Sequence, residues 1–393
     1  MIIKKYKEKK LSVAIVVPTF IPETYGGAEQ QTLKMAVSLK NHNIYPFILA
    51  PKIKKDTPLE SLEKTIPVKR FKLNNLPNLG GRNIFSFIIW FLKLTYWLIK
   101  NSNKFDIIHV IHGRLHSVPA IFAAKILKKP VLIKLGRGGK KYFDVNSVSM
   151  KKIIGKFFSK YILKNTTGWI ANSKMMETDL KYHNIKDEFI HKIYNGVDID
   201  KIKVKKFNKN KTFLVIGRLS EEKNCEQIIR VFSKIPKNLD VKLVFLGKDY
   251  SDGSQKKYLV KMTNDLNQTH RITFEGEVED VNDQLSNADF YISASKSEGM
   301  SNALLESMAL GVPAIASNVS GVEEIIIDNK NGFIFEPDDE KLFYDKIINA
   351  INCSEEDYIK MSRSASEHML KNFSIDLIAK KHIALYNSFI KKN

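Results

Sequence analysis

The sequence predicts an α/β protein made of two Rossmann-like domains, each built on a parallel sheet. Short apolar runs alternate with helical segments along nearly the whole chain, which is typical of parallel strands joined by crossover helices. The 393 residues, 44% of them hydrophobic, are enough for two cores. No GxGxxG fingerprint is present, which argues against a nicotinamide dehydrogenase. We expect a first domain over residues 1–199, a linker over 200–211 and a second domain over 212–373.

The net charge of +21 comes entirely from the first half of the chain. Residues 1–200 hold 35 Lys+Arg and 14 Asp+Glu, whereas residues 201–393 hold 28 of each. A basic half indicates a polyanionic partner or an anionic membrane surface, or else only solvation by lysine. Nucleic acid is disfavoured, because no recognisable binding module is present and the basic segments alternate with apolar rather than stacking residues.

Cysteine use and the N-terminus indicate a cytoplasmic protein. Cys225 and Cys353 are far apart in sequence and belong to no CxxC or metal-ligand cluster. Met1–Lys10 is polar, carries five lysines and lacks the apolar region of a signal peptide. We therefore expect a reducing compartment.

The first expected strand, Leu11–Val17, leads into a loop that ends in Gly26 and Gly27 before the helix Ala28–Lys40. Open parallel sheets bind ligands at this edge, and adjacent glycines let the backbone approach a diphosphate or a sugar closely. A Gly-Gly turn without a ligand is the alternative. The other strands expected in this domain are Tyr45–Ala50, Ile66–Leu73, a strand beginning near Asp106, Pro130–Leu135, Gly168–Asn172 and Ile190–Tyr194.

Polar side chains follow two of these strands. His109, His112 and Arg114 are expected toward the carboxyl end of the strand near Asp106, and no acidic or cysteine residue stands at metal-ligand spacing beside them. Contact with a substrate or a phosphate is therefore favoured over metal binding. Arg137 follows the next strand along the chain, so we expect it at the same edge of the sheet.

The segment Ile84–Ile99 is almost wholly apolar and contains Trp90, Lys93 and Trp97. Its 16 residues fall short of the roughly 20 that a membrane-spanning helix needs. Two interpretations remain open: a helix buried against the sheet, or an interfacial helix whose tryptophans lie at headgroup level.

A basic amphipathic helix is predicted near the end of the basic run Ala124–Lys164, which contains twelve basic residues and one acid, Asp144. Such a helix either packs on the sheet with a solvated lysine face or binds anionic lipid. The lysines around its apolar stripe are Lys151, Lys152, Lys156, Lys160 and Lys164.

The second domain opens with a buried strand that ends at Gly217, followed by Arg218 and Lys223. Arginine supplies a planar fork and lysine a mobile point charge, a pairing suited to neutralising a diphosphate. A solvated turn beside Glu221 and Glu222 is the alternative. Further strands are expected at Val241–Gly247, Arg271–Gly276, Asp289–Ala294 and Val312–Ser317, and closing helices at Asp338–Ile351, Glu355–Asn372 and Ser374–Lys392.

The stretch Ser297–Glu306 is where we expect the chemistry. A strand delivers a loop containing Gly299 onto a helix with Ser301 as its N-cap, so backbone N–H groups and the helix dipole favour a phosphate there. Glu298 in the loop and Glu306 on the helix flank that position and can accept hydrogen bonds from hydroxyls. An ordinary strand-loop-helix with solvated glutamates is the alternative.

This spacing, Glu298, seven residues and Glu306 followed by Ser-Met-Ala-Leu-Gly-Val-Pro, resembles the signature of the retaining glycosyltransferases of family 4. The resemblance implies a GT-B fold of two Rossmann-like domains facing each other across a cleft, with residues 374–393 crossing back to the first. It also implies a sugar donor activated as a nucleoside diphosphate. The further matches are Gly26-Gly27-Ala28-Glu29, Asn195-Gly196-Val197-Asp198, Gly217-Arg218-Leu219 with Lys223, and Phe274-Glu275-Gly276.

By resemblance, Arg218 and Lys223 stabilise the leaving diphosphate, Glu298 contacts the donor sugar and Glu306 the ribose. The three catalytic residues would be Arg218, Lys223 and Glu298. No Asp-rich motif is present, so we expect no metal and no other cofactor. The residues expected to bind the donor are Gly27, Arg218, Lys223, Glu277, Val278, Glu298, Gly299, Met300, Ser301, Asn302 and Glu306.

The first domain would hold the acceptor, which we expect to be a lipid-linked saccharide at the inner membrane face. Gly136 stands where many family members place a histidine, so no catalytic histidine is assigned. A nucleotide-sugar epimerase of the same fold and a basic nucleic-acid-binding protein are the rival functions. The acceptor-side residues are Glu29, His109, His112, Arg114 and Arg137.

Overall fold

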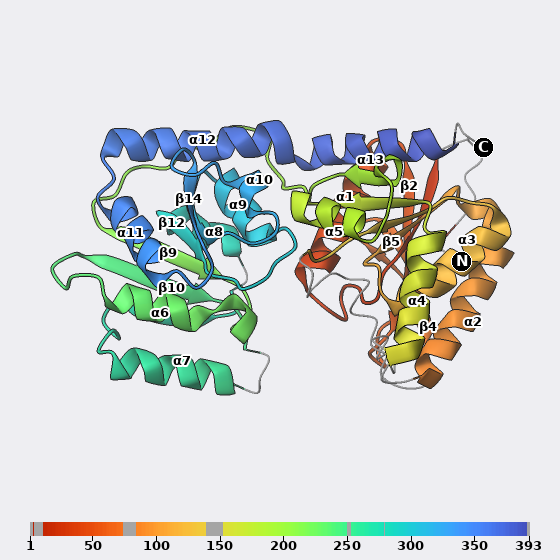
Figure 1. Cartoon of the computed structure of the whole chain (residues 1–393), viewed down its shortest axis with the longest axis horizontal. Helices are drawn as coiled ribbons and strands as arrows, with labels where there is room; N and C mark the ends of the chain where they lie inside the picture. The colour runs from red at the N-terminus through yellow and green to blue at the C-terminus, as the bar shows by residue number, and fades with distance from the viewer. Residues whose placement is uncertain are drawn as a thin grey trace. The chain divides into compact units, whose positions relative to one another are not determined.

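The computed structural model describes residue 3 and the ranges 11–73, 84–138, 152–249, 253–278 and 280–390. Lys151, Asp144 and all of Met1–Lys10 except Ile3 lie outside the described residues, as does the side chain of Lys152. The chain divides into two compact units (Figure 1). Unit 1 comprises residues 1–196 and 375–393, and unit 2 comprises residues 197–374.

Unit 1 is an eight-stranded sheet with helices on both faces. Its elements are β1 (Ser12–Val16), α1 (Gly27–Asn41), β2 (Tyr45–Lys52), β3 (Glu60–Glu63), β4 (Ile66–Lys72), α2 (Ile84–Lys100), η1 (Ser102–Lys104), β5 (Ile107–Ile111), η2 (Leu115–Ser117), α3 (Val118–Leu127), β6 (Val131–Lys134), α4 (Lys152–Asn165), β7 (Gly168–Ala171), α5 (Lys174–Tyr182), η4 (Asp187–Phe189), β8 (Ile190–Lys192) and α13 (Ile375–Ile390). The strand order is β3-β4-β2-β1-β5-β6-β7-β8, and only β3 pairs antiparallel among these strands. The parallel strands are buried because both faces are covered.

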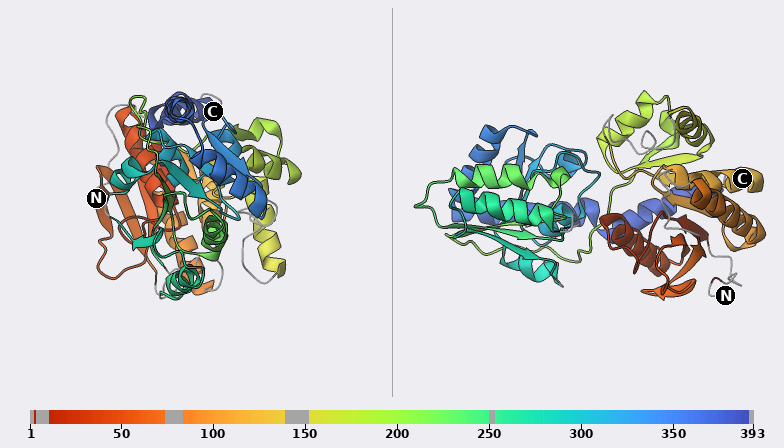
Figure 2. Two further views of the ribbon diagram at one scale, coloured as in Figure 1. Left: turned by 90° about the vertical axis from the view of Figure 1, so that its left-hand side faces the viewer. Right: turned by 90° about the horizontal axis from the view of Figure 1, so that it is seen from below.

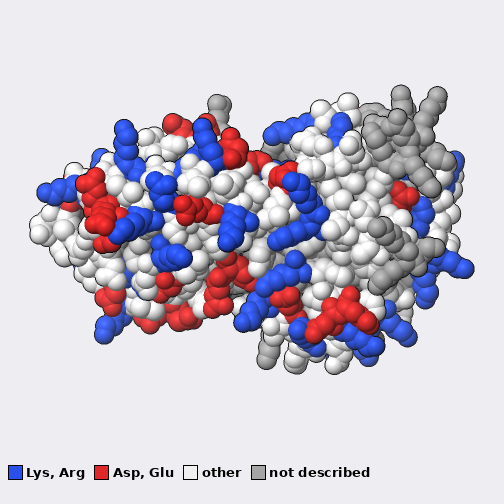
Figure 3. All heavy atoms as spheres, turned by 90° about the horizontal axis from the view of Figure 1, so that it is seen from above, with Lys and Arg blue, Asp and Glu red and all other residues white. Residues whose placement is uncertain are grey.

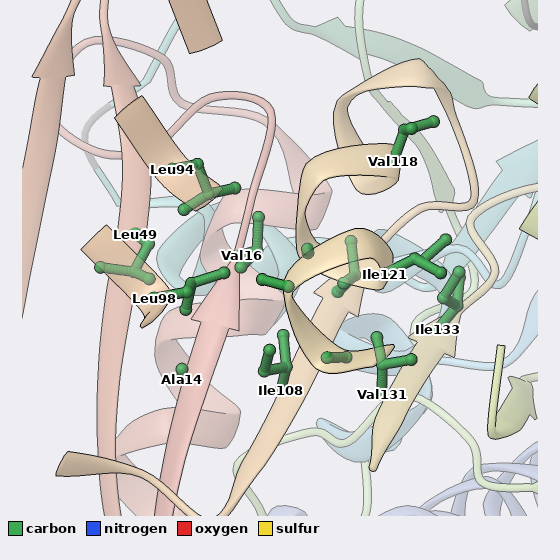
Figure 4. Close-up of a cluster of buried hydrophobic side chains, with 14 of the residues drawn as sticks. Ala14, Val16, Leu49, Leu94, Leu98, Ile108, Val118, Ile121, Val131 and Ile133 are labelled. Carbon is green, nitrogen blue, oxygen red and sulfur yellow. The ribbon is translucent and has the colours of Figure 1, made fainter. Parts of the chain in front are cut away.

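Alternate residues of the unit 1 strands face two separate cores. Ala14 and Val16 of β1 point toward α2 and α3 (Figure 4), whereas Val13 and Ile15 belong to the core formed with α1 and α13. The helices α2 and α3, orange in Figure 2, contact each other, and α3 contacts α4. The sheet therefore has α2, α3, α4 and α5 on one face and α1 and α13 on the other.

Unit 2 is a six-stranded sheet in which all the described pairings are parallel. Its elements are β9 (Lys211–Ile216), η5 (Glu221–Lys223), α6 (Cys225–Ser233), β10 (Val241–Leu246), α7 (Ser254–Asp265), β11 (Ile272–Gly276), α8 (Val281–Asn287), β12 (Phe290–Ser293), α9 (Asn302–Ala309), β13 (Ala314–Ser317), α10 (Val322–Ile325), β14 (Gly332–Phe335), α11 (Glu340–Ile351) and α12 (Glu355–Phe373). The order is β11-β10-β9-β12-β13-β14. The segment 200–211, expected as a linker, lies within unit 2, where the Lys203 amide donates to Ser366 Oγ of α12 at 2.9 Å.

The apolar segment predicted over Ile84–Ile99 is the helix α2, and its tryptophans face the core. Trp90 and Trp97 are buried, and Trp90 Nε1 donates to the His116 carbonyl at 3.0 Å. The interpretation that placed these tryptophans at headgroup level is therefore wrong, because packing on the sheet uses this side of the helix. Among the described helices, none combines the length and the apolarity that crossing a bilayer requires.

Candidate functional site

Two loops of unit 2 meet at the carboxyl ends of the neighbouring strands β9 and β12. The first runs from Gly217 through η5, and the second runs from the end of β12 to the start of α9. The Lys296 amide of the second loop donates to the Glu222 carbonyl of the first at 2.9 Å. Because parallel strands end at the same edge of the sheet, residues distant in sequence are placed together here.

An ion pair between Lys223 and Glu298 joins these two loops. Lys223 Nζ contacts Glu298 Oε1, and their side chains are only 20% and 18% exposed. Ser295 Oγ also donates to Glu298 Oε1, at 2.9 Å. Burial lowers the pKa of Lys223, but Glu298 together with Tyr291 and Glu222 outweighs burial and leaves the pKa above its ordinary value. Lys223 is therefore a cation at neutral pH, and the structure pairs two predicted site residues with each other.

Arg218 is the more accessible cation of the site. Its side chain is 58% exposed, and its guanidinium lies 3.9 Å from Glu222 Oε2. A contact of this length between exposed groups holds the arginine weakly. Arg218 can therefore turn toward a ligand with little loss, whereas Lys223 is held in place.

The start of α9 lies beside this ion pair, and the predicted N-cap is confirmed. Ser301 Oγ accepts a hydrogen bond from the Leu304 amide at 3.4 Å. Tyr291 of β12 is fully buried and hydrogen-bonds with the side chains of Ser301 and Ser293, and burial raises its pKa. Tyr291 therefore stays protonated and ties the cap to the strand below it, although nothing in the sequence pattern had marked it.

Two glycines that the sequence analysis did not select allow the loops to pack this closely. Gly321 has φ 89°, and a Cβ atom there would lie 2.6 Å from the Gly299 carbonyl oxygen. Gly247 has φ 144°, and its Cβ would lie 1.8 Å from the Gly217 carbonyl oxygen. Any larger residue at either position would displace the backbone of a site loop.

The other predicted donor residues of unit 2 lie at the same edge of the sheet, whereas Gly27 lies in unit 1. Glu306 is half-buried on α9, and Met300 is buried before it. Glu277 and Val278 directly follow β11, two strands away from β9; Glu277 is exposed and lies 3.6 Å from Lys248 Nζ. The structure thus groups Lys223, Glu298 and the α9 start tightly and places the residues after β11 farther along the edge.

A second pocket lies in unit 1 at the carboxyl ends of β1 and β5. It is open to solvent and has a volume of about 200 Å³. Glu29 is oriented by the hydroxyls of Thr19 and Thr24, the latter at 3.1 Å. A Cβ atom on Gly26 would lie 2.5 Å from Glu29 Oε2, so the glycine makes room for this carboxylate. The pocket is lined by Val17, Pro18, Thr19, Ala28, Glu29, Thr32, Ile111, His112 and Arg114.

The prediction of His109 as an acceptor-side residue is wrong. His109 lies inside β5, fully buried, with Nδ1 2.7 Å from the Tyr386 hydroxyl of α13. Burial, together with the nearby Lys134, lowers its pKa to about 3. Gly27 is the first residue of α1, and Arg137 is half-buried just after β6. Glu29, His112 and Arg114 therefore form the predicted cluster without His109.

Two family models match nearly the whole chain. Glycosyltransferase Family 4 matches residues 25–201, and Glycosyl transferases group 1 matches residues 197–368. The chain therefore belongs to the glycosyltransferases that these two models describe. The second match contains the loops after β9 and β12 that hold Lys223 and Glu298, and the first contains Glu29 and Arg114.

Relatives and solved structures agree with the assignment. An uncharacterised glycosyltransferase of Methanocaldococcus jannaschii is 29% identical over 350 residues, covering 84% of this chain and 86% of the relative. The UDP-Gal:alpha-D-GlcNAc-diphosphoundecaprenol alpha-1,3-galactosyltransferase of Escherichia coli is 26% identical, covering 71% and 74%. The structure of Anabaena HepE in complex with UDP and glucose has a TM-score of 0.75 at 18% identity, covering 96% of this chain and 100% of HepE. The fold of this chain is therefore the GT-B fold of glycosyltransferases.

Proposed function

We propose that this glycosyltransferase moves a sugar from a UDP-sugar to a lipid-linked saccharide, with retention of the anomeric configuration, in surface polysaccharide synthesis. GDP-sugars are the second choice of donor. The observation that carries the donor assignment is the cation Lys223, held by Glu298 beside Arg218 and the start of α9. Two positive charges and a helix N-terminus at one sheet edge suit a diphosphate. The complex of HepE with UDP supports this choice.

Stabilisation of the leaving diphosphate is the main catalytic contribution in this proposal. A lysine ammonium has three donors, so Lys223 can keep its contact with Glu298 and still donate to a phosphate oxygen. Because Glu298 is engaged by Lys223 and Ser295, we assign it to orienting the lysine and the donor sugar rather than to covalent attack. Retention would then follow from front-face attack through an ion-pair-like transition state. Arg218 and Lys223 would supply the positive charge, so we propose transfer without a metal ion.

The acceptor assignment places unit 1 at the inner face of the cell membrane. Unit 1 holds 39 Lys+Arg and 13 Asp+Glu, whereas unit 2 holds 24 and 29. An excess of lysine on one unit favours an anionic bilayer, where a lipid-linked saccharide would lie. In the unit 1 pocket, the Glu29 carboxylate can accept hydrogen bonds from sugar hydroxyls, and the Arg114 guanidinium can bind a phosphate.

A transfer assay tests this proposal. The protein would be incubated with a panel of UDP- and GDP-sugars and a polyprenyl diphosphate saccharide, with and without EDTA, and the new linkage would be assigned by NMR. We expect an α-linked product from an α-linked donor and the same rate in EDTA. Release of free nucleotide and an epimerised sugar without acceptor would support the rival epimerase instead.

A further inference from the structure

The outward face of α2 carries large apolar side chains along its whole length. Phe85, Leu92 and Tyr96 are 73%, 61% and 64% exposed, and Ile88 and Ile99 are exposed as well. Steps of three or four residues separate these five positions, so they form one stripe on the helix. Scattered exposed apolar residues are normal, but a continuous stripe of them indicates an interaction surface.

The stripe is not needed for packing inside unit 1, because the opposite side of α2 fills the core. Leu94 and Leu98 point into the cluster under the helix (Figure 4), together with the two tryptophans. The neighbouring helices extend the exposed surface: Phe122 of α3 packs on Phe91 with a ring separation of 5.4 Å, and Phe157 of α4 is 64% exposed. We call this surface the apolar ridge; it consists of Phe85, Ile88, Leu92, Tyr96, Ile99, Phe122, Ile126 and Phe157.

The three helices that form the apolar ridge carry charges of a single sign. The helices α2, α3 and α4 contain no aspartate or glutamate, and between residues 64 and 176 the only acids are Asp106 and Asp144. Lys100 Nζ lies 3.1 Å from the Tyr96 hydroxyl, so its stem follows the ridge while its ammonium reaches the polar side. Unit 2 differs, since basic and acidic side chains are interleaved on its face in Figure 3. The exposed lysines on and beside these helices are Lys93, Lys100, Lys125, Lys128, Lys156, Lys160 and Lys164.

We propose that the apolar ridge of α2, α3 and α4 inserts into the interface of an anionic bilayer while these lysines contact lipid phosphates. This proposal rests on the proposed function, because a lipid-linked acceptor would reach the protein at the bilayer surface. A bilayer fits both properties of the surface, because apolar side chains enter the acyl boundary and ammonium groups stay at the phosphates. A second copy of the chain fits less well, since a two-fold contact would oppose lysines with no acid on these helices to pair them.

Flotation with vesicles tests the docking surface. The full chain would be mixed with vesicles of equal parts phosphatidylcholine and phosphatidylglycerol, or of phosphatidylcholine alone. One variant replaces Phe85, Leu92 and Tyr96 by serine; another replaces Lys156, Lys160 and Lys164 by glutamine. The matched charge control replaces three exposed lysines of unit 2 by glutamine, Lys237, Lys257 and Lys261.

Each lysine at an anionic surface changes partitioning about fivefold, so the α4 triple variant is expected to bind about 100-fold more weakly. The serine variant should lose binding to a similar degree, and the unit 2 control should change about threefold or less. All variants should keep the wild-type circular dichroism spectrum and UDP affinity. Equal binding by wild type and both ridge variants would overturn the proposal, as would a wild-type dimer that the serine variant converts to a monomer in light scattering. If the wild type does not bind UDP, that result would instead refute the proposed donor.

Discussion

The ion pair between Lys223 and Glu298 predicts an unusual stability pattern when either residue is replaced. Lys223→Met would leave the Glu298 carboxylate, 18% exposed, without its counter-charge. Removing one partner of a buried pair costs about 3–5 kcal/mol, and we expect the lower end because Ser295 still donates to Glu298. Replacing both residues, by Lys223→Met with Glu298→Gln, should recover about 2 kcal/mol of that loss.

The three tryptophans make the assay specific to one unit. Trp90, Trp97 and Trp169 all lie in unit 1, so tryptophan fluorescence follows unit 1 while circular dichroism follows both units. In urea unfolding, Lys223→Met should move the circular dichroism transition of unit 2 to a lower urea concentration. The fluorescence transition of unit 1 should stay at the same urea concentration. The matched control is Lys360→Met, whose partner Glu356 is 77% exposed, and which should leave both transitions nearly unchanged. Strictly additive losses in the double variant would refute the coupling.

Three further predictions concern other parts of the molecule. Glu306→Gln should weaken UDP binding in calorimetry relative to the exposed control Glu367→Gln. Glu298→Gln should bind UDP as the wild type does but lose sugar transfer. Equal losses of UDP binding in Glu306→Gln and Glu298→Gln would refute this division of roles. The burial of His109 should lower the unfolding free energy of unit 1 by about 1.5 kcal/mol between pH 6.5 and 5, because the unfolded histidine is protonated there whereas buried His109, with a pKa of about 3, stays neutral. Buried His382, whose pKa is also lowered, should add to this loss. His109→Gln should reduce that slope in fluorescence-monitored urea unfolding, and an unchanged slope would argue against it. Gly321→Ala should lower UDP affinity by displacing the Gly299 carbonyl, and wild-type affinity would contradict the close packing.

The order of strands and helices could be predicted from the sequence, because apolar runs and helical periodicity are local. The hairpin β3–β4 was missed for an equally local reason. Glu60–Glu63 is polar and poor in β-formers, and its turn residues Lys64 and Thr65 adopt φ 44° and 76° without the usual Asn-Gly. The strand β14 was missed as well, although Phe333 and Phe335 are buried, because its four residues are too few to show a strand period.

The contacts of the site depend on distant parts of the chain. Lys223 and Glu298 are 75 residues apart and meet only because β9 and β12 are neighbours in the sheet. The burial of His109 likewise depends on Tyr386, which arrives with α13. Residue types and loop positions were therefore enough to predict which cations and carboxylates belong to the site. Which of these side chains are in contact depends on strand order and packing.

Calorimetric titration of UDP most directly tests whether the loops after β9 and β12 form the diphosphate site. The wild type should bind one UDP per chain. Arg218→Ala should bind it about 10-fold to 100-fold more weakly, as expected for one charge-assisted contact. Arg363→Ala, an exposed arginine of α12 away from these loops, should bind as the wild type does. Absence of UDP and GDP binding, or equal affinities for Arg218→Ala and Arg363→Ala, would contradict the assignment.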